Sequence, residues 1–191
     1  MLSILICTHP GREESFTKLV TELGRQLHEI HLFEYDNIDI LSDDDPHKTI
    51  GRKRNDLIAR VNTKYFCFID SDDMVSRDYI KKIYDALCAN YPDCCSLTGV
   101  ITWDGENPEL FDHSIKYLAY RTNEVAAPIR YERYPNHLNV IKTEIGKQFK
   151  FPEINHGEDT DWATQIFKSG LLKKEVEIPG VIYHYQFKTK K

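Results

Sequence analysis

Three carboxylates stand within four residues immediately after a short apolar run. Asp70, Asp72 and Asp73 follow "YFCFI" in the stretch "YFCFIDSDD". Like charges at this spacing repel one another, and a nearby cation offsets that repulsion. Carboxylate oxygens suit hard cations such as Mg²⁺ and Mn²⁺, which keep coordination positions open for water or phosphate oxygens. The cluster therefore predicts a metal site that clamps a diphosphate. The alternative is that these residues only end a strand and cap the next helix.

A second acidic group, "HGEDTDW", places Glu158, Asp159 and Asp161 at the start of a predicted helix. Helix N-termini stabilise negative charge, so helix capping is one interpretation of this group. The other interpretation is a general base, whose carboxylate must lie within hydrogen-bond reach of the proton that it removes.

Basic residues and a late histidine complete the set of candidate groups. Arg52, Lys53 and Arg54 stand at a predicted helix start, where positive charge opposes the helix macrodipole, so they favour an anion nearby. The alternative is that they are solvated and face the acidic segment 43–45. His184 lies on a late predicted strand, in "YHYQF". A lone histidine is usually structural, but beside an oxygen-rich cation site its imidazole would be an additional ligand.

These groups fall at the ends of an alternating series of strands and helices. Apolar runs and helical spacing predict strands at 2–8, 29–36 and 65–69 and helices at 13–27, 52–61 and 77–90, with a loop over 36–51. This alternation predicts a parallel sheet covered by helices. In such sheets ligands bind beyond the carboxyl ends of the strands, where 8–12, Asp36 and 70–73 are expected to lie.

The second half of the chain is less regular. It predicts a strand at 95–105, helices at 143–148 and 160–169, and two short strands within 175–187 around Pro179 and Gly180. The thirty residues after Gly105 are rich in Tyr, Arg and Pro and match no pattern. Neither a linker nor a repeat divides the chain, so we expect a single domain over 1–191.

Composition excludes several classes of protein. The 191 residues are 41% hydrophobic and 29% charged, as in soluble globular proteins, and the formal net charge of −5 argues against a nucleic-acid binder. Five cysteines without CxxC spacing predict neither a disulfide framework nor a zinc site. No apolar stretch approaches the ~18 residues that span a bilayer, so we expect no transmembrane segment. A cytoplasmic protein, with at most peripheral contact at a membrane surface, fits this composition.

Read in order, "SILICTHPGR", "GRKRNDLIARVNTKYFCFIDSDD", "GEDTDW" and the late histidine resemble the family 2 glycosyltransferases with the GT-A fold. The resemblance follows the whole chain in order and is strongest over 50–73 and 157–162. It implies an α/β fold, a single GT-A (Rossmann-like) domain with a mostly parallel central sheet flanked by helices. It further implies a nucleotide-sugar-binding half over 1–100 and an acceptor and catalytic half over 101–191.

The resemblance also implies roles for individual residues. Asp159 would be the catalytic base, and the metal would be held by Asp72, Asp73 and His184. The residues that would bind the nucleotide sugar are Thr8, Pro10, Arg12, Asp36, Arg54, Asn55, Asp70, Ser71 and Asp72. Aromatic faces pack well on sugars, although tryptophans are more often core residues. The acceptor candidates in the second half are Trp103, Asp104, His137, Asn139 and Trp162.

The expected reaction is the transfer of a sugar from a nucleoside diphosphate sugar, a UDP-hexose, to a hydroxyl of a glycan or another acceptor. The resemblance implies inversion at the anomeric carbon and dependence on Mn²⁺ or Mg²⁺. One alternative is a haloacid-dehalogenase-like phosphatase with Asp70 as nucleophile and Asp72 as acid/base. Against it, Met74 stands where a Thr or Val is expected, and two strands precede the motif. The other alternative is a non-catalytic sugar-nucleotide-binding module.

Overall fold

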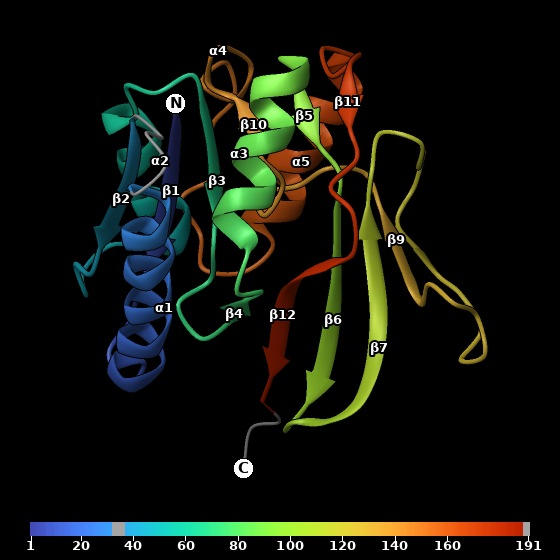
Figure 1. Ribbon diagram of the computed structural model, residues 1–191, viewed down its shortest axis with the longest axis horizontal. Helices are drawn as coiled ribbons and strands as arrows, with labels where there is room; N and C mark the ends of the chain where they lie inside the picture. The colour runs from blue at the N-terminus through green and yellow to red at the C-terminus, as the bar shows by residue number, and fades with distance from the viewer. Residues whose placement is uncertain (32–36, 189–191) are drawn as a thin grey trace.

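The computed structural model describes residues 1–31 and 37–188 and contains two six-stranded sheets (Figure 1). The first sheet has the order β11-β5-β10-β3-β1-β2. At its centre, β1 (Leu2–Cys7) pairs in parallel with both β2 (Ile38–Asp43) and β3 (Tyr65–Phe68). The sheet is completed by β5 (Cys94–Cys95), β10 (Ile141–Lys142) and β11 (Glu175–Val176), of which β10 runs antiparallel to its neighbours.

Successive side chains of β1 point to opposite faces of the first sheet, so both faces carry apolar residues. Helices cover both of these faces. Leu2, Ile4 and Ile6 pack in one hydrophobic cluster, which includes residues of α1 (Glu13–His31) and α3 (Tyr79–Asn90). Leu5 and Cys7 pack in a second cluster, together with residues of α2 (Ile50–Arg60) and α5 (Glu158–Ser169). The short α4 (Thr143–Gly146) follows β10. The predicted α/β fold class is confirmed.

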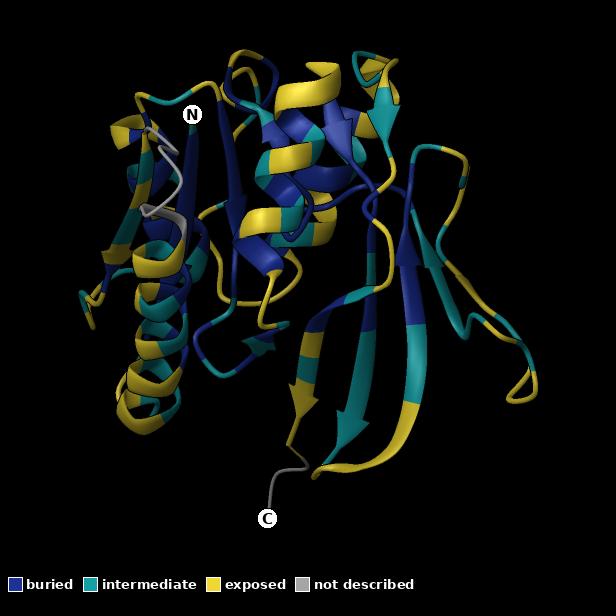
Figure 2. Cartoon of the chain, viewed as in Figure 1, coloured by how far each residue is buried: buried dark blue, intermediate teal, exposed yellow. Residues whose placement is uncertain are grey.

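The second sheet has the order β4-β12-β6-β7-β9-β8 and mixes parallel and antiparallel pairs. Its strands are β4 (Met74–Val75), β6 (Leu97–Trp103), β7 (Glu106–His113), β8 (Arg121–Thr122), β9 (Tyr131–Arg133) and β12 (Val181–Phe187). Figure 2 shows that β7 and β12 are buried where they approach the first sheet and become exposed toward their far ends, whereas β6 becomes half-buried there. The segment without a sequence pattern thus forms much of this sheet.

The second strand of the first sheet differs from the sequence prediction. Helix α1 continues to His31, and the strand is Ile38–Asp43, within the stretch expected to be a loop. This strand lies at the edge of the sheet, where Ile38 and Ile40 pack against one core cluster and Leu41 against the other, and Asp39 is exposed. An edge strand therefore does not require the continuous apolar run that identified β1 and β3.

Candidate active site

The carboxyl ends of β1 and β3 meet the N-terminus of α5 at a cleft of about 640 Å³. The turn after β1 contributes Pro10 and Arg12, and the turn after β3 contributes Asp70 and Asp72. From the opposite side, α5 contributes Glu158 and Asp159, and the end of β12 adds further lining residues. The parallel pairing of β1 with β3 brings the two turns together, as expected for ligand sites in α/β sheets.

Close packing holds the loop before α5 against α2. A Cβ atom on Gly51 would lie 1.8 Å from the carbonyl oxygen of Pro152, so only glycine fits there. The backbone N–H of Gly51 donates to the carbonyl oxygen of Ile154 (3.1 Å), and the N–H of Ile50 donates to Oδ1 of Asn155 (3.0 Å). These contacts fix the segment that leads into α5 and to its cleft-facing carboxylates.

Asp70 is the most strongly held carboxylate of the cleft. Arg54 donates from Nη2 to its Oδ1 at 3.1 Å, and Nε2 of His137 lies 3.6 Å from its Oδ2. Burial alone would raise the pKa of Asp70, but the charges of His137 and Arg54 outweigh it and hold this pKa well below its usual range. Asp70 is therefore ionised in the folded protein at neutral pH.

Arg54 lies in the wall behind Asp70 with only 4% of its surface exposed. Its guanidinium carbon is 5.4 Å from the ring centroids of both Phe68 and Phe151, a cation–π arrangement. Nη2 also lies 3.6 Å from Oε1 of the buried Glu158. Two carboxylates and two rings thus surround one buried cation.

His137 joins the two acidic groups. The residue is 4% exposed, and its Nδ1 lies 3.7 Å from Oδ2 of Asp159 while Nε2 faces Asp70. Neither ring nitrogen has a hydrogen-bond partner. The main chain fixes its place, because its carbonyl oxygen accepts from the N–H of Phe68 at 2.9 Å. Asp159 keeps 32% of its side chain exposed, so its carboxylate is accessible from the cleft.

Asp72 and Asp73 have different environments. Asp72 is paired with Nη1 of Arg12 at 3.0 Å and lines the cleft, and burial together with the charge of Asp70 raises its pKa. Asp73 is 1% exposed, and its two oxygens accept from the Tyr183 hydroxyl and from the N–H of Gln186, each at 2.8 Å. Burial raises the pKa of Asp73 well above its usual value, and the nearby charge of Asp70 adds to this shift. Asp73 ties the turn to β12 and also lines the cleft, and its role as a metal ligand stays a prediction.

His184 does not reach the cleft. It is exposed, whereas Tyr183 on one side is buried and Tyr185 on the other lines the cleft. Because successive side chains of a strand point to opposite faces, His184 points away from the acidic residues. Asp72 lines the cleft and His184 does not, and the role of His184 as a metal ligand stays a prediction. Within the described residues, no group of three or more His, Cys, Asp or Glu side chains could hold a metal ion.

Several predicted nucleotide-sugar residues serve the fold around the cleft. Asn55 exchanges two hydrogen bonds with the main chain of Phe151, both at 2.9 Å. The carbonyl oxygen of Thr8 accepts from Nζ of the fully buried Lys53 at 2.6 Å. Ser71 is fully buried, and none of these residues lines the cleft. Asp36 lies outside the described residues.

A second pocket of about 420 Å³ adjoins the cleft and shares Asp70, His137 and Asp159 with it. Of the acceptor candidates, Trp103 and His137 line this pocket. Asp104 is an exposed turn residue between β6 and β7, with a φ of 52°. The structure brings it to neither cavity.

Two acceptor candidates are structural. Trp162 is fully buried, stacks on Phe151 with ring centroids 4.7 Å apart, and lines neither of the two cavities. Asn139 is 1% exposed, and its amide donates to the carbonyl oxygens of Cys95 and His113. The spacing of apolar residues along a helix does not distinguish a tryptophan in the core from one at a binding surface.

Sequence reasoning missed other lining residues. The cleft is also lined by His9, Asn155, His156, Tyr185, Gln186 and Lys188, and the adjoining pocket by Tyr131 and Arg133. The alternation in "YHYQF" is the one signal that could have found Tyr185, because it places Tyr and His on opposite faces of a strand. Tyr131 and Arg133 lie in the segment without a pattern.

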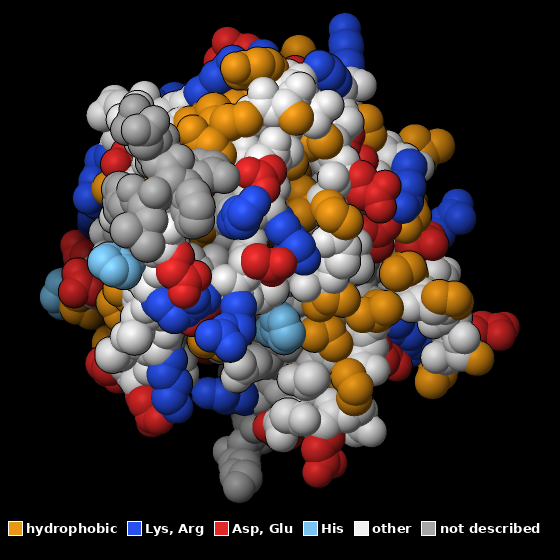
Figure 3. All heavy atoms as spheres, in the orientation of Figure 1, with side chains coloured by type: hydrophobic (Ala, Val, Ile, Leu, Met, Phe, Trp, Pro, Cys, Tyr) orange, Lys and Arg blue, Asp and Glu red, His pale blue; other side chains and the backbone are white. Residues whose placement is uncertain are grey.

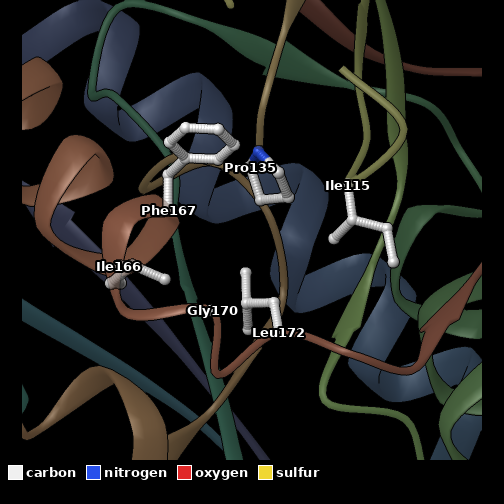
Figure 4. A pocket seen from close by; sticks show the side chains of 6 residues that line it. All are labelled: Ile115, Pro135, Ile166, Phe167, Gly170 and Leu172. Atoms are coloured by element: carbon white, nitrogen blue, oxygen red, sulfur yellow. The ribbon is translucent and has the colours of Figure 1, made fainter. Parts of the chain in front are cut away.

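Two further surface features of the described residues differ from the acidic cleft. The face in Figure 3 carries Lys and Arg side chains interspersed with Asp and Glu, not a single basic patch. Figure 4 shows a smaller apolar pocket of about 160 Å³ lined by Ile115, Pro135, Ile166, Phe167, Gly170 and Leu172. It shares no residue with the acidic cleft. None of the described helices is long and apolar enough to cross a membrane.

Solved structures share this arrangement of sheets and helices. One is S. aureus TarS 1–349 in complex with UDP-GlcNAc, with 13% identity, a TM-score of 0.67 and coverage of 100% of this chain and 59% of that chain. Another is S. aureus TarS 1–349 in complex with UDP, with 14% identity, a TM-score of 0.66 and coverage of 97% and 60%. The chain thus spans about three fifths of those chains. The likeness establishes the predicted GT-A fold.

The sequence comparison gives the family. Glycosyl transferase family 2 matches residues 21–164, and the chain belongs to this family. No curated protein matches the chain. Family membership confirms the resemblance seen in the motifs and decides against the phosphatase alternative, in which Asp70 would be a nucleophile.

Proposed function

We propose that the chain transfers a sugar from a nucleoside diphosphate sugar, with a UDP-hexose as donor, to a hydroxyl of an acceptor. The observation that carries this proposal is the row of Asp70, His137 and Asp159, which lines both cavities. Nε2 of His137 lies 3.6 Å from Oδ2 of Asp70, and Nδ1 of His137 lies 3.7 Å from Oδ2 of Asp159. A donor in one cavity and an acceptor in the other would meet at these residues. Family membership and the nucleotide complexes of TarS support the choice of donor.

The donor would occupy the cleft at the ends of β1 and β3. Pro10 and Arg12 would border the nucleotide, and Asp70 would accept hydrogen bonds from the ribose hydroxyls. The charges of His137 and Arg54 support this role because they keep Asp70 ionised, and Arg54, which also lines the cleft, donates a hydrogen bond that orients it. Asp36 as the residue that contacts the base stays a prediction.

A divalent cation fits this cleft only together with the donor. Asp72 is the carboxylate that we assign to the cation, because it lines the cleft with 20% of its side chain exposed, whereas both oxygens of Asp73 are already engaged. Mg²⁺ and Mn²⁺ are commonly held by one or two carboxylates plus substrate phosphates, which suits a site of this kind. When bound, the cation would neutralise charge on the leaving diphosphate. Asp72 would then release Arg12 and bind the cation instead.

Asp159 is the proposed general base. It would take the proton of the acceptor hydroxyl while the hydroxyl oxygen forms a bond to the anomeric carbon. The bond from that carbon to the diphosphate breaks, and the diphosphate leaves with the electron pair. Because attack comes from the face opposite the leaving group, the anomeric configuration inverts. His137 would hold the carboxylate of Asp159 toward the acceptor.

A ligand panel tests this function. Thermal unfolding is measured with UDP, UDP-GlcNAc, UDP-glucose, GDP and ADP, each with Mn²⁺ and with a chelator. A ligand at a hundred times its Kd stabilises a protein by about 2.7 kcal/mol, so uridine nucleotides with Mn²⁺ should raise the Tm measurably. Asp72→Asn should reduce the shift, whereas Asp39→Asn, an exposed carboxylate on β2, should not.

Two outcomes would contradict parts of the proposal. If no nucleotide raises the Tm, or if inorganic phosphate does so equally well, the cleft is not a nucleotide-sugar site. If UDP-sugars bind but the protein releases no UDP with any acceptor, the non-catalytic binding module is the better description.

A further inference from the structure

The pocket beside the donor cleft has features that select a ligand. We define the acceptor pocket by Trp103, Tyr131, Arg133, His137, Asp159 and Tyr185. Its catalytic end is the wall shared with the donor cleft, where His137 is 4% exposed and has two ring nitrogens without hydrogen-bond partners. These nitrogens face the carboxylates of Asp70 and Asp159 at 3.6 and 3.7 Å, so this end of the pocket is a histidine held between two acidic residues.

The side walls are aromatic. Trp103 on β6 and Tyr131 on β9 have ring centroids 6.4 Å apart at 46°, and both are only partly buried. Tyr131 also packs against the edge of the hydrophobic core, and both rings line the pocket. Aromatic rings with one apolar face and a polar edge suit a saccharide, which offers C–H faces and peripheral hydroxyls.

The end formed by Arg133 is positively charged. Arg133 lies two residues after Tyr131 on the same face of β9, and its guanidinium carbon is 4.8 Å from the centroid of Tyr120. Nη1 donates to the carbonyl oxygens of Arg121 and Glu132. No carboxylate among the described residues forms an ion pair with Arg133, in contrast to Arg130, which is paired with Glu109 at 3.4 Å.

Arg133 is half-buried and has carbonyl oxygens and the rings of Tyr120 and Tyr131 as partners, but among the residues that the structure describes it has no carboxylate to neutralise its charge. Burial lowers the pKa of Arg133, which reflects this loss of solvation without a carboxylate partner. The guanidinium geometry matches phosphate and carboxylate groups, because its N–H groups donate in a fixed planar fork. The acidic wall at Asp70 and Asp159 would repel the same anion, so the two ends of the pocket orient it.

From these observations we propose that the acceptor is a saccharide with an anionic substituent, a phosphate or a carboxylate. The anion pairs with Arg133, the sugar face packs between Trp103 and Tyr131, and the reacting hydroxyl lies at His137 and Asp159. This inference rests on the proposed function, because it assigns the second substrate of the same reaction. The competing explanation is that Arg133 only ties residues 120–121 to β9.

A binding experiment separates these explanations without requiring turnover. The full chain is saturated with UDP and Mn²⁺, so that anionic probes cannot occupy the donor cleft. Methyl glucoside, methyl glucuronide and glucose 6-phosphate are then titrated and their affinities compared by ligand-observed NMR. The carboxylate and phosphate probes distinguish the two sources of negative charge. We expect at least one anionic probe to bind roughly 10- to 100-fold more tightly than methyl glucoside, as for one charged hydrogen-bonded pair.

The variants are Arg133→Gln, Arg133→Lys and the matched control Arg130→Gln. Arg133→Gln should remove the preference for the anionic probe and leave methyl glucoside binding within about 3-fold, while Arg133→Lys should retain part of it. Arg130→Gln should keep the preference. UDP-dependent stabilisation should survive in all three variants. If UDP does not stabilise the wild-type protein, that result refutes the proposed function and not the assignment of Arg133.

Two results would overturn the inference. One is a wild-type chain that binds UDP but binds no anionic probe more tightly than methyl glucoside. The other is an Arg133→Gln variant that melts earlier but keeps the wild-type ratio between anionic and neutral probes, which would assign Arg133 to the fold alone.

Discussion

Replacing the buried Arg54 by Met should destabilise the protein more than removing an exposed charge of the same helix, α2. The substitution keeps an apolar chain between Phe68 and Phe151 but removes the cation that faces Asp70 and Glu158 at 3.1 and 3.6 Å. Removing one partner of a buried ion pair leaves an uncompensated charge and costs about 3–5 kcal/mol. We therefore expect a loss of this size at pH 7.

Urea denaturation followed by tryptophan fluorescence measures this loss, because Trp162 is fully buried against Phe151. With an m-value of about 2 kcal/mol/M, the midpoint should fall by about 2 M. The matched control is Arg52→Met on the same helix, where a 51% exposed side chain pairs with Asp56. An exposed pair of this kind is worth about 0–1 kcal/mol.

A second substitution checks the cause. In the Arg54→Met background, Asp70→Asn removes the unpaired charge and should recover about 0.5–3 kcal/mol. The pKa of Asp70 is depressed in the folded state, so its contribution is present above its ordinary value of 3.8 and is lost as the pH falls toward the folded value. A loss below about 1 kcal/mol for Arg54→Met, or no recovery in the double variant, would refute this electrostatic account.

Three further predictions concern other parts of the fold and site. Burial lowers the pKa of His113 from 6.5 to about 3, so between these pH values the unfolded chain binds more protons and the stability of the fold rises with pH. Acidification to pH 5 should therefore lower the free energy of unfolding of the wild type by roughly 2 kcal/mol. In urea denaturation, His113→Leu should lack this pH dependence. Gly51→Ala should lower the free energy of unfolding by about 1–3 kcal/mol and weaken UDP binding, because the new Cβ meets Pro152. Gly24→Ala, with open space around the new Cβ, should instead stabilise by about 0.4–1 kcal/mol. Chelation should weaken UDP binding by wild type but change binding by Asp72→Asn little, as calorimetry would reveal.

The parts of the fold that could be predicted from sequence are those with strong periodicity. The strands β1 and β3 are continuous apolar runs buried on both faces, and α5 begins at the acidic group that marked it. Because the ends of parallel strands meet at one edge, the positions of Arg12 and Asp70 in one cleft followed from chain order alone. The edge strand β2 and the strands β7 to β9 did not follow, since half-exposed strands carry mixed residues.

Individual side chains were harder to assign than elements. Asp73 has the same residue type as its neighbours, and only its contacts with Tyr183 and Gln186, more than a hundred residues away, make it structural. The direction of His184 depends on the pairing of β12 with β4 and β6, which involves a register shift. Such long-range register is not encoded in a local pattern. For the same reason, the partnership of His137 with Asp70 and Asp159 became visible only in the folded chain.

The comparison of Asp159→Asn with the wild type tests the central claim most directly. The rate of UDP release from a UDP-sugar in the presence of an accepted hydroxyl compound is measured per folded molecule, alongside UDP affinity and Tm. Removal of a positioned base typically costs about 10²- to 10⁴-fold in rate, and we predict a loss in this range with near-normal UDP affinity and Tm. A variant that melts earlier but releases UDP at close to the wild-type rate would contradict the account, because Asp159 would then be only a helix-start carboxylate.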